Sequence, residues 1–301
     1  MIVFASSITE PDTYKRCAER GIQVATAGAG GADIEVMPHS AAGSLFRSYN
    51  LILDTLAERD DLEALVLVHQ DAEIADPGFV AKLRQALSDP EVGVVGCVGA
   101  IGVRSIAWWE GSVTWASFVH RYRELGGGEL PAFAWNGSEM PAYARTGEVD
   151  TVDGFVLGLS PWTVRNMRFD ESLGALHGYD FDFCLQVRDA GHKVVTADFK
   201  VIHHHSLELI GNPETWIEAH MRVAEKWDGR MPNVGVVAGT WKERARRAEA
   251  EAAAARAQAV SIQLQSDARL KEITESTGWR LTEPLRRINA ARRRLRRRAA
   301  G

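Results

Sequence analysis

The fold is decided by residues 44–79, SLFRSYNLILDTLAERDDLEALVLVHQDAEIADPGF. Apolar residues recur at spacings of three and four over 45–58, which predicts an amphipathic helix. Residues 64–68 form a continuous apolar run, as expected for a strand buried on both faces of a sheet. A polar run, 69–73, follows directly. A helix, a buried strand and a polar run in this order predict an α/β domain with its chemistry at the carboxyl end of the strand.

Outward from this stretch, the first 240 residues continue to alternate short apolar runs with helical patterns. Residues 101–148 interrupt the alternation, because tryptophans, glycines and prolines are mixed there without period, and we expect a long irregular insert. We expect strands at 2–5, 22–27, 34–37, 64–68, 92–98, within 149–159 and within 194–205, and helices at 11–20, 45–58, 77–87, 181–190 and 213–227.

Composition excludes several classes of protein. Of 301 residues, 46% are hydrophobic and 25% are charged, which is ordinary globular usage and not that of a disordered or collagen-like chain. No apolar run approaches the ~20 residues that span a membrane, and the amino-terminal residues do not resemble a signal peptide. Three distant cysteines without a CxxC argue against a disulfide framework or a cysteine zinc site and suit a reducing compartment.

The charge is divided unevenly along the chain. The net charge is −5, but residues 242–301 carry 16 basic and 7 acidic residues. Residues 241–301 are therefore read as a basic helical tail on an acidic body. The last segment, 285–300, holds eight arginines beside a narrow apolar stripe, a pattern typical of interfacial helices. It predicts a peripheral membrane contact. The alternatives are docking on a partner, a solvated tail and nucleic-acid binding. Nucleic acid is the weaker of these, because the body is acidic and contains no nucleic-acid-binding motif.

Two polar clusters have the composition of a metal site. His69, Asp71 and Glu73 lie two residues apart, so an extended chain would point neighbouring members of this series to one face. His203 and His205 flank a third histidine at the end of a strand-like run. Imidazole and carboxylate together suit Mn²⁺ better than Mg²⁺. The alternatives are a polar turn and a solvated histidine cluster.

Two further features could contact a substrate. Asp180 stands just before a predicted helix, where a carboxylate serves as a general base or simply as a cap on the helix. Trp109, within the irregular insert, is the candidate for stacking on a sugar, although such a tryptophan often only packs a loop.

These segments, in this order, resemble glycosyltransferase family 2, which has the GT-A fold. Residues 44–79 resemble the segment that holds the nucleotide sugar, with HQD in place of DxD. Residues 152–206, VDGFVLGLSPWTVRNMRFDESLGALHGYDFDFCLQVRDAGHKVVTADFKVIHHHS, resemble the acceptor-side segment with its base motif and late histidine. The resemblance implies a Rossmann-like mixed sheet flanked by helices in a domain over 1–240, with 101–148 as an acceptor-side insert.

The same resemblance implies a role for each candidate residue. Asp71 would bind the metal that bridges the donor diphosphate, with Glu73 or His69 beside it, and His203 or His205 would complete the site. Asp180 would be the base. The residues expected near the donor or acceptor are Asn50, Asp153, Gly154 and Trp109.

The resulting expectation is a metal-dependent, inverting glycosyltransferase. It would move a sugar from a nucleoside-diphosphate donor to a glycan or lipid-linked acceptor, in polysaccharide or cell-envelope synthesis, in the cytoplasm or at the inner face of the plasma membrane. The alternatives are a metal-dependent nucleotidyltransferase or phosphohydrolase, and an inactive module that binds glycan or acts as a scaffold.

Overall fold

The computed structural model describes residues 1–30, 33–103, 106, 113–122, 128–129, 146–205, 213–232 and 264–286. The chain divides into two compact units, Met1–Val237 and Ala238–Gly301. The predicted boundary between residues 240 and 241 lies outside the described residues. Among the helices that are described, none combines the length and the apolar character needed to cross a bilayer.

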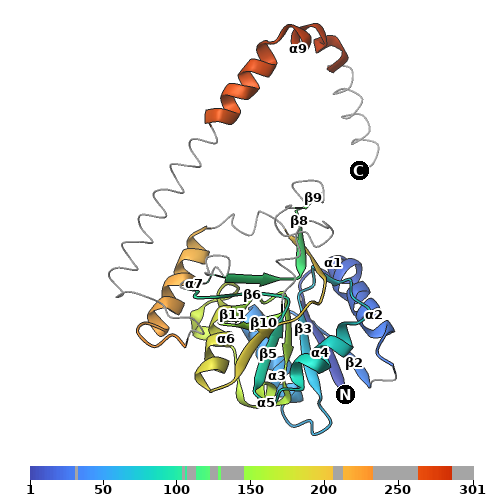
Figure 1. Cartoon of the computed structure of the whole chain (residues 1–301), viewed down its shortest axis with the longest axis vertical. Helices are drawn as coiled ribbons and strands as arrows, with labels where there is room; N and C mark the ends of the chain where they lie inside the picture. The colour runs from blue at the N-terminus through green and yellow to red at the C-terminus, as the bar shows by residue number, and fades with distance from the viewer. Residues whose placement is uncertain are drawn as a thin grey trace. The chain divides into compact units, whose positions relative to one another are not determined.

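A seven-stranded mixed sheet forms the centre of the first unit (Figure 1). Its order is β10-β13-β5-β12-β3-β1-β2. β1, β2 and β3 are parallel, whereas β12 runs antiparallel to both β3 and β5. The expected α/β architecture, a mixed sheet flanked by helices, is therefore confirmed. The strands are β1 (Ile2–Ile8), β2 (Ile34–Ser40), β3 (Ala64–Val68), β5 (Val92–Gly96), β10 (Gly147–Val149), β12 (Val156–Leu159) and β13 (Lys193–Thr196).

Two hydrophobic cores cover the two faces of this sheet. Alternate residues of a strand point to opposite faces, so Val3 belongs to one core and Phe4 to the other. One core includes helices α3 (Leu45–Leu56), α5 (Pro161–Asn166) and α6 (Tyr179–Asp189). The other includes α2 (Arg20–Ala27) and α4 (Phe79–Leu87).

Local sequence fixes where the helices next to the site begin. Ser44 caps α3, since its hydroxyl accepts a hydrogen bond from Arg47 N at 3.1 Å. Gly178 precedes α6 with a φ of 77°, a left-handed conformation that glycine adopts without strain. Asp180 therefore lies inside the first turn of α6, where a negative charge is favoured by the helix dipole.

The strand expected at 22–27 is wrong. These residues belong to α2, which continues a helical segment through α1 (Pro11–Tyr14) and the π-helical turn Lys15–Glu19. Ile22 and Ala25 are three residues apart and both are buried, so the run fits a helix period as well as a strand. Gly21 does not end the helix. A side chain there would place its Cβ 2.3 Å from the backbone nitrogen of Ile74.

Two smaller sheets stand beside the main one. Their orders are β4-β14-β8-β9 and β11-β6-β7. The described parts of 101–148 contain short strands of both sheets, although the pattern there predicts irregular structure. The remaining elements are β4 (Ala72–Ile74), β6 (Val98–Ile101), β7 (Val113–Ala116), β8 (Phe118–Tyr122), β9 (Gly128–Glu129), β11 (Thr151–Val152), β14 (Val201–His205), the 3₁₀ turn Glu171–Leu173, α7 (Pro213–Lys226) and α9 (Thr277–Leu281).

Candidate functional site

Two segments far apart in the sequence meet at the end of β3. After β3 the chain turns, and Ala72 N donates a hydrogen bond to the carbonyl oxygen of His69 at 3.0 Å. β4 then pairs antiparallel with β14, which sets His203 opposite Ala72. The turn that carries Asp71 therefore lies against the strand that carries the late histidines.

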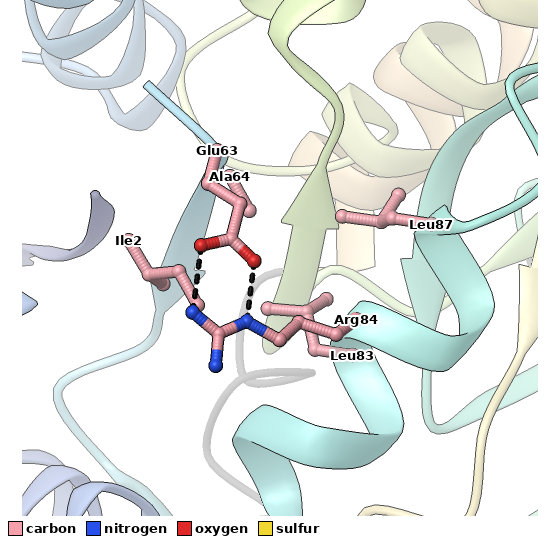
Figure 2. Close-up of a pocket in the computed structure, with 6 residues that line it drawn as sticks. All are labelled: Ile2, Glu63, Ala64, Leu83, Arg84 and Leu87. Carbon is pink, nitrogen blue, oxygen red and sulfur yellow. Dashed lines mark hydrogen bonds and ion pairs between the residues drawn. The ribbon is translucent and has the colours of Figure 1, made fainter. Parts of the chain in front are cut away.

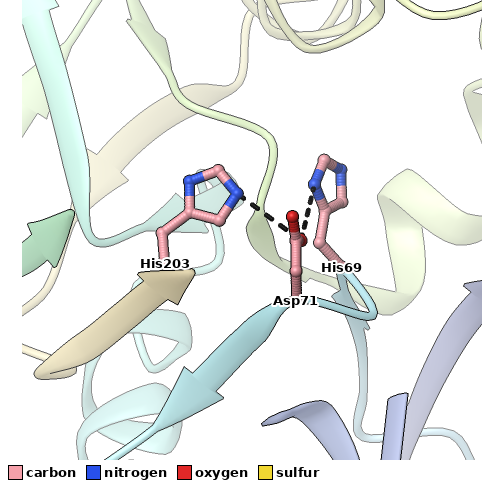
Figure 3. Close-up of side chains that lie close together, drawn as sticks. All are labelled: His69, Asp71 and His203. Carbon is pink, nitrogen blue, oxygen red and sulfur yellow. Dashed lines mark ion pairs between the residues drawn. The ribbon is translucent and has the colours of Figure 1, made fainter. Parts of the chain in front are cut away.

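Three side chains from these segments point toward one another (Figure 3). Asp71 Oδ1 lies 3.5 Å from His203 Nε2 and 3.9 Å from His69 Nδ1. One donor atom from each residue lies within 4.8 Å of the other two. We call these three residues the HDH cluster. Two imidazoles and a carboxylate are a donor set that divalent transition metals bind.

The electrostatics of the HDH cluster keep its carboxylate charged. Burial raises the pKa of Asp71, but the charge and hydrogen bond of His203, together with the charge of His69, lower it more, so the pKa lies well below its usual value. Burial lowers the pKa of His69, which favours the neutral imidazole that binds metals. Although burial also lowers the pKa of His203, Asp71 raises it more.

Glu73 does not join the HDH cluster. Its carboxylate accepts a hydrogen bond from His204 Nε2 at 2.9 Å and lies 3.5 Å from Arg20 Nε. The side chains of Asp71 and Glu73 do not share a face, as an extended chain would require, because Asp71 lies in a turn and Glu73 in a strand. The sequence left either His69 or Glu73 open as the partner of Asp71. In the structure His69 lies beside Asp71, and Glu73 pairs with His204. The side chain of His205 lies outside the described residues.

Asp180 is held by two backbone amides. Its carboxylate oxygens accept hydrogen bonds from Gly154 N and Phe181 N, each at 2.9 Å. Burial raises the pKa of Asp180, the nearby charge of Asp153 raises it further, and the two amides lower it, so that the pKa is about 7. A carboxyl group with this pKa can accept a proton near neutral pH. Three of the predicted residues, Asp153, Gly154 and Asp180, therefore lie together.

Tyr179 connects this carboxyl group to the HDH cluster, and our sequence analysis missed it. The phenol oxygen lies 2.6 Å from His69 Nε2. A buried tyrosine in the first turn of a helix looks like an ordinary core residue in the sequence. The signal that was available is its position beside Asp180.

Gln70 was also missed. Its side-chain oxygen accepts hydrogen bonds from Thr9 N and Glu10 N, both at 2.9 Å, and its amide nitrogen donates to Thr9 Oγ1 at 2.8 Å. The middle residue of HQD thus fastens the turn after β3 to the end of β1. This contact spans about sixty residues, and no local pattern in the sequence announces it.

The last two residues expected near the donor or acceptor are Asn50 and Trp109, and the structure describes only Asn50. The Asn50 amide donates to the carbonyl of Phe169 at 2.9 Å and accepts from its N–H at 2.8 Å, and it also donates to Glu171. Asn50 therefore holds α3 to the segment before α6. Trp109 lies outside the described residues.

A polar core behind α6 fixes the helix that carries Asp180. Asp182 is fully buried and accepts hydrogen bonds from Trp227 Nε1 at 2.7 Å and from Lys226 Nζ at 3.0 Å. Lys226 also bonds Asp170 at 2.7 Å. This network joins α6, α7 and the segment that contains Asp170. Because all its groups are paired, it serves to hold the helix in place.

A cavity of about 220 Å³ lies at the opposite end of the strands (Figure 2). Ile2 and Ala64, the first residues of β1 and β3, line it, whereas the HDH cluster follows the last residue of β3. Its two charged groups satisfy each other, since Arg84 Nη2 donates to Glu63 Oε2 at 2.8 Å. The full lining is Ile2, Glu63, Ala64, Leu83, Arg84 and Leu87. This cavity is separate from the candidate site.

Comparison with known proteins identifies similar chains. StrF, a streptomycin biosynthesis protein of Streptomyces griseus, is 32% identical over 171 residues, which are 54% of this chain and 53% of StrF. The chain thus spans about half the length of that relative. Two solved structures are similar at lower identity. GalNAc-T7 with UDP, GalNAc and Mn²⁺ is 11% identical with a TM-score of 0.48, covering 76% of this chain and 48% of that one.

The second solved structure is the mannosyltransferase PcManGT from Pyrobaculum calidifontis in complex with GDP-Man and Mn²⁺. It is 14% identical with a TM-score of 0.41, covering 67% of this chain and 55% of that one. A family model described as "Glycosyltransferase like family" matches residues 3–221. Because this match extends over most of the chain, the protein belongs to the glycosyltransferase-like family.

Proposed function

We propose that the protein transfers a sugar from a nucleoside-diphosphate donor to an acceptor hydroxyl group, with a divalent cation at the HDH cluster and Asp180 as the base. The observation that carries the proposal is the contact between His69 and Tyr179, which joins the cluster to the residue next to Asp180. Ligands for a cation and a carboxyl group with a pKa near neutrality are thus linked through two adjacent residues of α6. Family membership supplies the reaction class.

The donor set fits a cation. Asp71 supplies an anionic oxygen, and the two imidazoles supply nitrogens, which favours Mn²⁺ over Mg²⁺. A bound cation would act as a Lewis acid that neutralises charge on the leaving diphosphate. It would also let an acidic body accept an anionic donor, since the net charge of residues 1–241 is −14.

Asp180 removes the proton from the acceptor hydroxyl group in this scheme. Two backbone amides orient its carboxylate, and its raised pKa makes it a stronger base than an exposed carboxylate. Asp153 and Gly154 lie beside it and would border the donor sugar and acceptor. Attack from the side opposite the leaving diphosphate would invert the sugar configuration.

Asn50 and Trp109 have more distant roles in the proposal. Asn50 would shape the nucleotide side indirectly, by anchoring α3 to Phe169. Trp109 is kept as the stacking residue for a sugar on the strength of the sequence alone. Glu73 is assigned to its pair with His204, and His205 is retained as an additional ligand from the sequence.

The carboxy-terminal unit suggests a glycan or lipid-linked acceptor at a membrane surface. Leu281 and Leu285 are 76% and 62% exposed, and the Arg286 guanidinium stacks on Trp279 at 3.7 Å from the ring centroid. Exposed apolar side chains next to an arginine-rich sequence suit an anionic bilayer. Sedimentation with anionic liposomes should pellet the full chain but not a chain without residues 285–301. Equal pelleting of the two would contradict membrane contact through residues 285–301.

A panel of nucleotide sugars tests the proposed reaction. Thermal unfolding is measured for each nucleotide sugar with and without Mn²⁺, because a ligand that binds only the folded state raises Tm. The correct donor should raise Tm only when Mn²⁺ is present. Product analysis with that donor should then find a glycosylated acceptor. Release of inorganic phosphate or pyrophosphate instead would indicate a phosphohydrolase or nucleotidyltransferase, and the absence of any Mn²⁺-dependent shift would contradict the proposal.

A further inference from the structure

The two nitrogens of His69 face two different groups. Nδ1 points toward the Asp71 carboxylate, 3.9 Å from Oδ1, and Nε2 lies 2.6 Å from the phenol oxygen of Tyr179. A neutral imidazole has one nitrogen with a lone pair and one with a hydrogen. Because only Nδ1 faces the cluster, this nitrogen must offer its lone pair if His69 is to bind a cation. The hydrogen must then reside on Nε2.

We propose that Tyr179 is a positioning residue that fixes the ring orientation and tautomer of His69. Its phenol oxygen accepts the hydrogen bond from Nε2–H, which leaves Nδ1 free to bind the cation. This inference rests on the proposed metal site and assigns a function to a residue outside the ligand set. It also gives the site a direct link to the base, since Tyr179 and Asp180 are adjacent in the first turn of α6.

The phenol has little freedom to move. Its ring packs edge-on against Phe46 and Tyr49, with centroids 6.0 and 5.9 Å away. Gly154 runs directly past it, so a Cβ at that position would lie 2.0 Å from the phenol oxygen. Burial raises the pKa of Tyr179 well above its usual value, and the hydroxyl group stays neutral. A fixed, neutral oxygen is the partner that would hold one imidazole tautomer.

Gly154 contributes to the position of two residues, Asp180 and Tyr179. Its backbone N–H donates to Asp180, and the empty space above its Cα admits the Tyr179 phenol. The glycine places the base and the residue that orients a metal ligand on one short segment of backbone. A displacement of this segment would disturb both at once.

Tyr179→Phe tests the inference, because it removes the oxygen and keeps the ring. Mn²⁺ binding is measured with the metal alone by the loss of the free-ion EPR signal. Loss of an outer partner of a ligating histidine typically weakens metal binding ~10–100-fold, so the Kd for Mn²⁺ should rise by that factor. Tyr49→Phe is the matched control. Its hydroxyl group is buried in the same aromatic group and has no hydrogen-bond partner among the described residues, so its removal should leave the Kd unchanged.

A second measurement uses the unmodified chain. Long-range ¹H–¹⁵N spectra of histidine-labelled protein with Zn²⁺, a diamagnetic probe, report which nitrogen carries the hydrogen, and His69→Gln assigns the signal. Nε2–H is expected in the wild type, and loss of this single tautomer is expected in Tyr179→Phe. Wild-type Mn²⁺ affinity in Tyr179→Phe would overturn the inference and leave the metal site standing. A hydrogen on Nδ1 of His69 would overturn the inference and also remove His69 from the proposed ligand set. Absence of Mn²⁺ binding in the wild type would overturn both the inference and the metal site.

Discussion

Two histidine–carboxylate groups lie on the same pair of segments, and they differ in what their carboxylates touch. Asp71 lies between two imidazoles in the HDH cluster, at 3.5 and 3.9 Å. Glu73, two residues later, is hydrogen-bonded to His204 at 2.9 Å and lies close to Arg20. The Asp71 carboxylate lies far enough from the two imidazoles for a cation to bind between them. The Glu73 carboxylate already accepts a hydrogen bond from His204 and faces the positive charge of Arg20.

The comparison shows that residue type alone does not define a metal site. Both groups contain imidazole and carboxylate, but in the described part of the chain only the HDH cluster has polar neighbours that hold a ligand and its turn in place. His69 is bonded to Tyr179, and Gln70 fastens the intervening turn to β1. A ligand set needs neighbours that hold it open and oriented, and the Glu73 pair has none of this kind in the described part of the chain.

The largest effect should separate the two carboxylates directly. Asp71→Asn removes the anionic ligand, and Lewis-acid stabilisation of a leaving diphosphate is worth several kcal/mol. Turnover with the donor identified in the panel should therefore fall ~10²–10³-fold, since each 1.36 kcal/mol is tenfold. Mn²⁺ binding should be lost in the same variant. Glu73→Gln is the matched control, with turnover within about twofold of wild type. If turnover fell by a comparable factor in Asp71→Asn and Glu73→Gln, Glu73 could no longer be distinguished from a metal ligand.

A smaller, graded effect should appear with pH. Asp180 acts as a base only when deprotonated, and its pKa is raised to about 7 by burial and by Asp153. Below this pH the deprotonated fraction decreases tenfold per pH unit, so kcat/KM at saturating Mn²⁺ should rise with pH and level off above about 7. Asp153→Asn removes the neighbouring charge and should shift this rise to lower pH. A flat profile between pH 5 and 8 would remove Asp180 as the base.

The smallest effect concerns the pair that is already neutralised. His204→Gln removes the imidazole that pairs with Glu73. The two side chains are 33% and 14% exposed, and partly exposed pairs of this kind contribute about 0–1 kcal/mol. The free energy of unfolding from urea denaturation should therefore change by no more than about 1 kcal/mol. Mn²⁺ affinity should stay at the wild-type value. If His204→Gln lost Mn²⁺ binding, the second group would have to be counted as part of the metal site.

The fold could be predicted from the sequence where one pattern dominated. The run at 64–68 is uniformly apolar and forms the buried strand β3, and Ser44 caps the predicted helix that precedes it. The prediction failed at 22–27, where the same residues satisfy a strand and a helix period. The helix forms because its buried positions pack under the sheet and Gly21 admits close contact with β4. That preference depends on tertiary contacts.

The residues alone predict the site only as a set of residue types, and it is the family resemblance that implies a shared site for Asp71 and His203. In the structure their meeting depends on the pairing of β4 with β14, over a hundred residues apart. His69 displaces Glu73 because a turn, not a strand, carries Asp71. Tyr179 contributes one oxygen to a contact across the core, which no periodicity reveals.

The close contact between α2 and β4 makes Gly21, fifty residues before Asp71 in the sequence, a determinant of the geometry of the candidate site. Any side chain at Gly21 would meet the backbone of Ile74 and Glu73, and β4 begins immediately after Asp71. A random mutagenesis screen for loss of sugar transfer should therefore recover substitutions at Gly21 that fold and express but have impaired turnover. Directed evolution toward new donors would do well to leave this position untouched.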